Sequence, residues 1–190
     1  MKKIISMLLC LVMLLGITTA VAETATADKV DLGSITVNGK FALKAKLPEG
    51  YTAQIFQVSS DSGYLVASIQ CEDKTKPKME LHVFYSVTDL SKLERLNDAT
   101  DEQLAAIEDT FREQDVVDIT YTETGLGTKL LVAKEIEDTT DWVSVFTVYK
   151  GYCIEFMLEP GDEAAEDHVT DEQVQKAIEF LTDLDFEPIA

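Results

Sequence analysis

The stretch WVSVFTVYKGYCIEFML, residues 142–158, decides the expected fold because it is the most apolar part of the chain after the N-terminus. β-Branched and aromatic residues, which favour strands, fill both halves, and Lys150-Gly151 stands between them where a tight turn needs a positive φ. The pattern predicts a β-hairpin. Two registers are open. A two-residue loop pairs Tyr149 with Tyr152, whereas a three-residue loop with a bulge at Gly151 shifts the pairing by one residue.

Both faces of this hairpin are largely apolar in either register, with Glu155 as the main exception. In the two-residue register, one face holds Val143, Val145, Tyr149, Tyr152, Ile154, Phe156 and Leu158. The other face holds Trp142, Phe146, Val148, Cys153 and Met157. A strand pair that is apolar on both sides needs cover on both sides. We therefore expect a sheet with helices or other layers on each face.

The rest of the chain supplies further strands and two helices. Alternating and β-branched runs predict strands at residues 35–37, 40–47, 52–58, 64–71, 79–86, 116–124 and 128–136. Helices are predicted after Thr100-Asp-Glu-Gln103 and Thr170-Asp-Glu-Gln173, because each is a capping box followed by apolar residues at helical spacing. The expected fold class is α+β, an antiparallel β-sheet of about six to nine strands sandwiched between helices.

This order of elements resembles the PsbP-like superfamily. The closest local similarity is the Lys150-Gly151 turn, an aromatic strand, a polar loop and a helix that closes on Leu184-Asp185-Phe186. The resemblance spans residues 35–186 as a pattern of elements without a signature motif. It implies an antiparallel sheet between helices. Members of the superfamily are photosystem subunits, binders of a small nuclear GTPase or uncharacterised exported bacterial proteins, so the resemblance assigns no functional residue.

The N-terminus has the pattern of a secretion signal. Lys2 and Lys3 precede an apolar run, and Ala20-Val21-Ala22 offers small residues for cleavage. The apolar run is too short for a stable membrane span. We therefore expect residues 1–22 to be a signal peptide, 23–34 a flexible leader and 35–190 one PsbP-like domain. The mature protein is expected to be secreted or extracytoplasmic, without a membrane span.

The strongly acidic composition limits the classes of partner. Residues 1–22 hold two of the 16 basic residues and none of the 35 acidic ones, so the mature chain has a net charge of −21. Nucleic acids and anionic lipid surfaces repel such a chain. The expected partner is an unknown protein or a component of the cell envelope, and the mature protein is expected to be a monomer.

The two cysteines beyond the signal, Cys71 and Cys153, lie in apolar strand patterns. An exported protein can form disulfides, so this pair is a disulfide candidate, with two small buried thiols as the alternative. Their spacing does not match zinc or thiol-redox motifs.

Candidate chemistry is sparse. His82 and His168 are the only histidines, and no Gly-x-Ser-x-Gly elbow is present, so the sequence predicts no catalytic residues and no resident cofactor. Glu155 could act as an acid or a ligand if it were buried, and the alternative is a position at the wet margin of the sheet. The acidic segment 159–167 offers oxygen ligands for calcium, with candidates Asp162, Glu163, Glu166 and Asp167, but it lacks the EF-hand pattern.

Three functional hypotheses follow from these observations. The first is an exported, non-enzymatic binding or interaction module. The second is a calcium-binding or other cation-binding protein that uses the acidic loop 159–167. The third is a hydrolase of unfamiliar type. A deep pocket around Glu155 or around either histidine would count against the first hypothesis.

Overall fold

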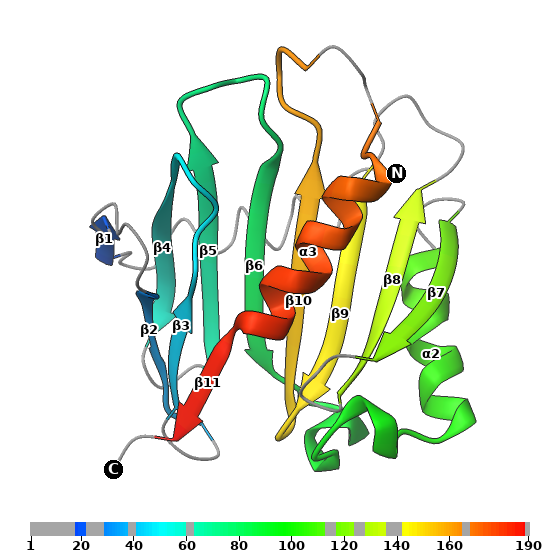
Figure 1. Ribbon diagram of the computed structural model, residues 1–190. Helices are drawn as coiled ribbons and strands as arrows, with labels where there is room; N and C mark the ends of the chain where they lie inside the picture. The colour runs from blue at the N-terminus through cyan, green and yellow to red at the C-terminus, as the bar shows by residue number, and fades with distance from the viewer. Residues whose placement is uncertain are drawn as a thin grey trace.

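The computed structural model describes residues 18–21, 29–37, 41–59, 63–112, 117–123, 128–135, 142–164 and 168–188. Within these ranges the chain forms two antiparallel sheets and two α-helices (Figure 1). The mixed α+β class is therefore confirmed, although strands dominate. The large sheet has the strand order β1-β4-β5-β6-β10-β9-β8-β7, and the small sheet has the order β11-β3-β2.

The large sheet consists of β1 (Thr18–Val21), β4 (Tyr51–Ser59), β5 (Tyr64–Cys71), β6 (Lys78–Tyr85), β7 (Val117–Glu123), β8 (Lys129–Glu135), β9 (Val143–Tyr149) and β10 (Tyr152–Glu159). The small sheet consists of β2 (Val30–Ile35), β3 (Phe41–Ala45) and β11 (Asp185–Pro188). The α-helices are α2 (Asp101–Arg112) and α3 (Asp171–Asp183), and two short 3-10 turns are η1 (Asp89–Lys92) and η2 (Leu96–Asp98).

The predicted hairpin lies inside the large sheet as β9 and β10. Lys150 has φ 51° and Gly151 has φ 79°, which are the successive positive values of a two-residue hairpin turn. Tyr149 pairs with Tyr152, so of the two registers left open the hairpin adopts the two-residue one. The two faces of the hairpin contribute to separate hydrophobic clusters, as that register predicts.

One face of the large sheet packs against α3 and the small sheet. Tyr152 and Phe156 of β10 are fully buried there. The Tyr152 ring lies 5.7 Å from the Phe41 ring of β3 and 5.3 Å from the Phe186 ring of β11. The Tyr152 hydroxyl donates a hydrogen bond of 2.7 Å to the Val37 carbonyl. These contacts fix the small sheet and the end of α3 onto the central hairpin.

The opposite face packs against α2 and the 3-10 turns. Leu96 of η2 and Ile107 of α2 are buried in one cluster with Phe146, Val148 and Cys153 of the hairpin. The predicted capping box at the start of α2 is confirmed by reciprocal bonds: Gln103 N donates to Thr100 Oγ1 at 3.2 Å, and Thr100 N donates to Gln103 Oε1 at 2.9 Å. The same arrangement begins α3 at Thr170.

Two expectations are not shown in the form predicted. A sheet sandwiched between helices (α/β/α) is not shown, because α3 shares its face with the small sheet and the strands fall into two sheets. The predicted flexible leader, residues 23–34, overlaps β2, which pairs with β3 from Val30 onward. In addition, Thr18–Val21 of the predicted signal peptide pairs with β4 as β1 at the edge of the large sheet. Residues 1–17 and 22–28 lie outside the described ranges.

Candidate functional site

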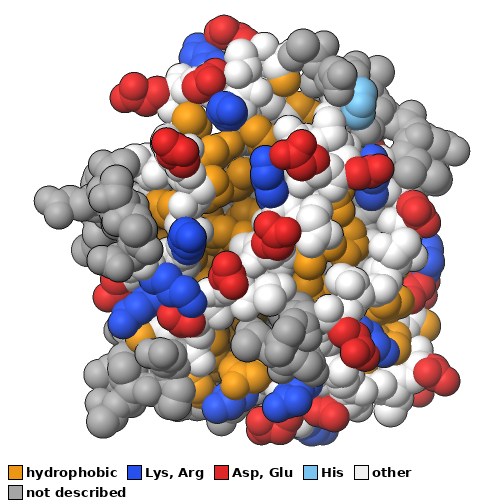
Figure 2. All heavy atoms as spheres, viewed as in Figure 1, with side chains coloured by type: hydrophobic (Ala, Val, Ile, Leu, Met, Phe, Trp, Pro, Cys, Tyr) orange, Lys and Arg blue, Asp and Glu red, His pale blue; other side chains and the backbone are white. Residues whose placement is uncertain are grey.

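The strongest candidate site is a groove of about 770 Å³ beside α3. We call it the α3 groove. Figure 2 shows hydrophobic side chains at the bottom of a hollow on this face of the molecule. The volume falls in the range of small-molecule sites, about 300–1,000 Å³. The α3 groove is lined by Lys46, Leu47, Pro48, Glu49, Tyr51, Thr75, Lys76, Pro77, Met79, Phe156, Leu158, Gln173, Lys176, Ala177, Glu179, Phe180 and Asp183.

The floor of the α3 groove is apolar because inward-facing positions of β6, β10 and α3 meet there. Met79 and Phe156 come from paired strands, and Ala177 and Phe180 come from the helix. The Phe156 and Phe180 rings stack at 4.2 Å between centroids with 15° between their planes. This stack fixes the distance between helix and sheet and therefore defines the inner end of the groove.

A buried tyrosine holds one wall of the α3 groove in place. The Tyr51 hydroxyl donates to the Pro77 carbonyl at 3.0 Å and so ties β4 to the 72–77 loop. Burial raises the pKa of Tyr51 to about 12, with smaller contributions from Cys71 and Asp73. Tyr51 is therefore protonated and acts as a hydrogen-bond donor at any physiological pH.

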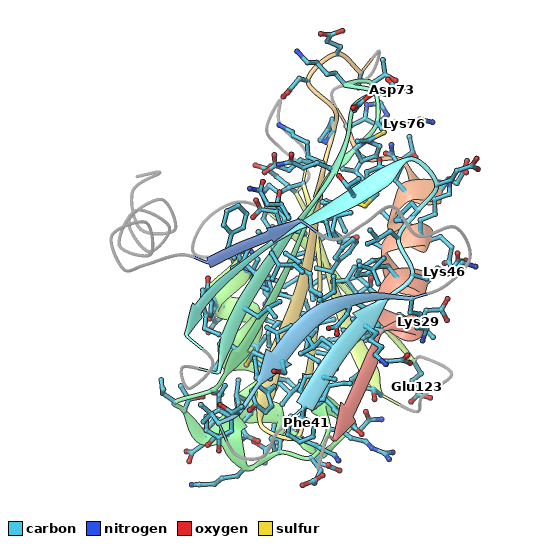
Figure 3. All side chains as sticks on the ribbon, turned by 90° about the vertical axis from the view of Figure 1, so that its left-hand side faces the viewer. Lys29, Phe41, Lys46, Asp73, Lys76 and Glu123 are labelled. Carbon is cyan, nitrogen blue, oxygen red and sulfur yellow. The ribbon has the colours of Figure 1, made fainter. Side chains whose placement is uncertain are left out.

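The rim of the α3 groove carries three lysines (Lys46, Lys76, Lys176) and three acids (Glu49, Glu179, Asp183). This balance contrasts with the formal charge of −19 for the whole chain. Lys176 is paired with Glu172 at 2.7 Å, whereas the ion pairs found within the described ranges do not include Lys46 or Lys76. Figure 3 shows both lysines on the side of the molecule that carries α3.

The predicted calcium ligands do not line the α3 groove, and the two that the structure describes form ion pairs with lysines. Asp162 accepts from Lys78 Nζ at 3.0 Å, and Glu163 lies 3.7 Å from Lys74 Nζ. Glu166 and Asp167 lie outside the described residues. In the part of the chain that the structure describes, no three His, Cys, Asp or Glu side chains gather as a metal site. A cation at Asp162 would have to displace the Lys78 ammonium.

Asp162 lines a second groove of about 680 Å³, and His82 lines it as well. We call it the His82 groove. Its lining includes Glu80, His82 and Met157, whose side chains project from the face of the large sheet opposite to the α3 groove. A deep pocket around either histidine was the feature expected to count against a non-enzymatic binding module, and the His82 groove is a feature of that kind.

The polar groups near the His82 groove are satisfied by carboxylates. Ser144 Oγ donates to Glu155 Oε1 at 2.7 Å, and His82 Nε2 lies 3.1 Å from Glu80 Oε2. Glu155 could serve as a base for this hydroxyl, but Ser144 is fully buried, so its hydroxyl is out of reach of a substrate in the groove. Glu155 is half-buried and accepts a hydrogen bond from this serine. It is therefore neither the fully buried acid nor the residue at the wet sheet margin that the sequence suggested as alternatives.

The candidate disulfide is not formed. Cys71 and Cys153 are both free. Cys153 pairs with Phe84, which in turn pairs with Tyr64 at the start of β5, whereas Cys71 ends that strand. The two thiols are thus separated by the length of β5, roughly 20 Å at the rise of a strand.

Thiol titration tests this separation in the chain from residue 23 onward. Burial raises the pKa of the Cys153 thiol to about 12, and the reactive thiolate is therefore scarce near neutral pH. Cys71 is half-buried at a strand end. We expect Ellman's reagent to modify one thiol in the folded protein and both after denaturation. Thiols that appear only after reduction would contradict this arrangement.

No family model, curated protein or solved structure is significantly similar to this chain. The PsbP-like resemblance therefore stays a prediction. No helix in the described ranges is both long and apolar enough to cross a membrane.

Proposed function

We propose that the protein is an exported binding module and that the α3 groove binds an amphiphile with an apolar body and an anionic group. The observation that carries this proposal is the apolar floor beneath a rim with Lys46 and Lys76, in a chain that is otherwise strongly acidic. An apolar ligand body would gain free energy by leaving water against Met79 and the Phe156–Phe180 stack. Export is supported by the charged start, apolar run and small residues of segment 1–22.

Lys46 and Lys76 would bind the anionic group of the ligand. A carboxylate or sulfonate in the rim would meet Lys46 or Lys76, neither of which appears in the ion pairs within the described ranges. Elsewhere on the surface, the excess of acids would repel the same group. The floor supplies affinity, and the lysines select the sign of the head group. This assignment involves no catalytic step.

Binding of a dansyl-labelled undecanoic acid, followed by fluorescence, tests this proposal. We expect the Lys46→Glu/Lys76→Glu variant to bind the probe about tenfold more weakly, since each exposed charge pair is worth up to about 1 kcal/mol. The matched control is Lys92→Glu/Arg112→Glu, which makes the same change in net charge on the α2 side of the molecule. The methyl ester of the probe should bind both variants equally. Equal loss of the acid in both variants would contradict a specific role for the rim.

Thermal unfolding separates this proposal from the calcium alternative. Lys78 neutralises Asp162, and Lys74 neutralises Glu163, so calcium should raise the melting temperature no more than magnesium or sodium chloride at equal ionic strength. A calcium-specific rise that Asp162→Asn/Glu163→Gln abolishes would favour the cation-binding alternative, because a ligand of the folded state stabilises that state.

A further inference from the structure

We propose that two copies of the exported chain associate through the β4 edge of the large sheet, pairing β4 with β4 of the second copy in antiparallel orientation. This proposal goes beyond the α3 groove, and it replaces the expectation of a monomer. Three observations support it. The strand at this edge belongs to the predicted signal peptide, β4 and β5 carry no charged residue, and β7 at the opposite edge carries two acids.

The strand that occupies the β4 edge belongs to the predicted signal peptide. β1 (Thr18–Val21) pairs antiparallel with residues 54–57 of β4 and forms the end of the sheet (Figure 1). Cleavage near Ala22 would remove β1. The outer backbone N–H and C=O groups of β4 would then lack a strand partner, and such a row of groups is a template for pairing with another extended chain.

The composition of this edge leaves it unprotected against pairing. Natural edge strands avoid other chains by being short or by carrying charges or proline. β4 is nine residues long, and its sequence YTAQIFQVS contains no charge and no proline. A bulge can also protect an edge, but the register shift in β4 lies between Gln57 and Ser59, at the end of the strand. The next strand, β5, also lacks charged residues, although such residues make up 27% of the chain. β7 at the opposite edge carries Asp118 and Glu123.

The absence of charge also favours a second copy as the occupant. Two chains of net charge −21 repel each other wherever their acids meet. Contact through β4 brings together β4 and β5 of each copy, two neighbouring strands that contain no acid, so the repulsion is weak there. An antiparallel pair of identical strands is related by a two-fold axis, which closes the assembly at two copies.

Sedimentation velocity of the exported protein tests the proposal over about a hundredfold range of concentration, with the N-terminus determined by intact mass. We expect a reversible dimer of chains that begin near residue 23. The edge variant is Thr52→Lys/Gln54→Lys, which places two charges on one face of β4. The matched control is Thr120→Lys/Thr122→Lys on β7, where the first threonine is likewise exposed and the second is likewise half-buried.

The edge variant should raise the dissociation constant of the dimer about tenfold or more, and the control should leave it within about twofold. Hydrogen exchange provides a second readout that needs no variant: amides of β4 should be protected in the dimer and exchange faster on dilution. The proposal is overturned if the protein is monomeric throughout, if both variants behave alike, or if the exported chain retains Thr18–Val21.

Discussion

Replacing Gly151 by alanine is expected to destabilise the protein by about 3 kcal/mol, which combines backbone strain with overpacking. Gly151 has φ 79°, which L side chains rarely adopt. A Cβ atom there would lie 2.5 Å from the Ser91 carbonyl oxygen and 3.1 Å from Tyr85 Cε2. The turn cannot move away easily, because Gly151 N donates to Leu93 O at 2.8 Å and Gly151 O accepts from Ser86 N at 3.0 Å.

The matched control for Gly151→Ala is Gly50→Ala. Gly50 has nearly the same backbone angle, φ 84°, but the nearest atom to its Cβ would be Cys71 Sγ at 3.7 Å, which is ordinary contact. Gly50→Ala should therefore cost only the backbone strain, about 1 kcal/mol. Urea unfolding measures both free energies. Equal losses of unfolding free energy in the two variants would mean that the Ser91 carbonyl does not pack against Gly151.

Replacing Phe156 by alanine should lower the free energy of unfolding by about 3–5 kcal/mol, as for other large buried side chains. Phe156 is 1% exposed and stacks on Phe180, so its removal leaves a cavity between β10 and α3. Phe111→Ala is the control. The Phe111 ring projects from α2, is half-buried and packs beside Phe146 of β9, so its loss should lower the free energy of unfolding by clearly less. Comparable losses in urea unfolding would contradict a core centred on the β10–α3 contact.

Local signals in the sequence were sufficient for the central hairpin and for the helix starts. The two strands β9 and β10 follow from their residue types and the Lys150-Gly151 turn, although the register between them was left open. The Thr100 capping box depends only on residues within one turn. Such predictions succeed because each structural feature and its cause lie close together in the chain.

The edge of the small sheet was missed for a local reason. β2 contains a bulge between Asp31 and Gly33, so its buried residues are Val30, Leu32 and Ile35 instead of a strictly alternating set. The pattern therefore resembled a leader. The bulge also explains why the predicted strand began only at residue 35.

The α3 groove was not predictable because its walls come from segments that are distant in sequence. Lys46, Lys76 and Phe180 meet only when the small sheet, the 72–77 loop and α3 are in place. One signal for it was present: Ala177, Phe180, Leu181 and Leu184 have i, i+3, i+4, i+7 spacing, which marks Phe180 as part of the buried stripe of the helix.

Methionine methyl resonances provide the most direct test of the α3 groove as the binding site. After residue 22 the chain contains only Met79 and Met157. Met79 lines the α3 groove and also borders the His82 groove, whereas Met157 lines the His82 groove alone. With methyl-¹³C methionine and the undecanoic acid probe, binding in the α3 groove should shift the Met79 signal and leave the Met157 signal in place. A shift of Met157, or no shift of Met79 at saturation, would mean that the probe does not bind in the α3 groove.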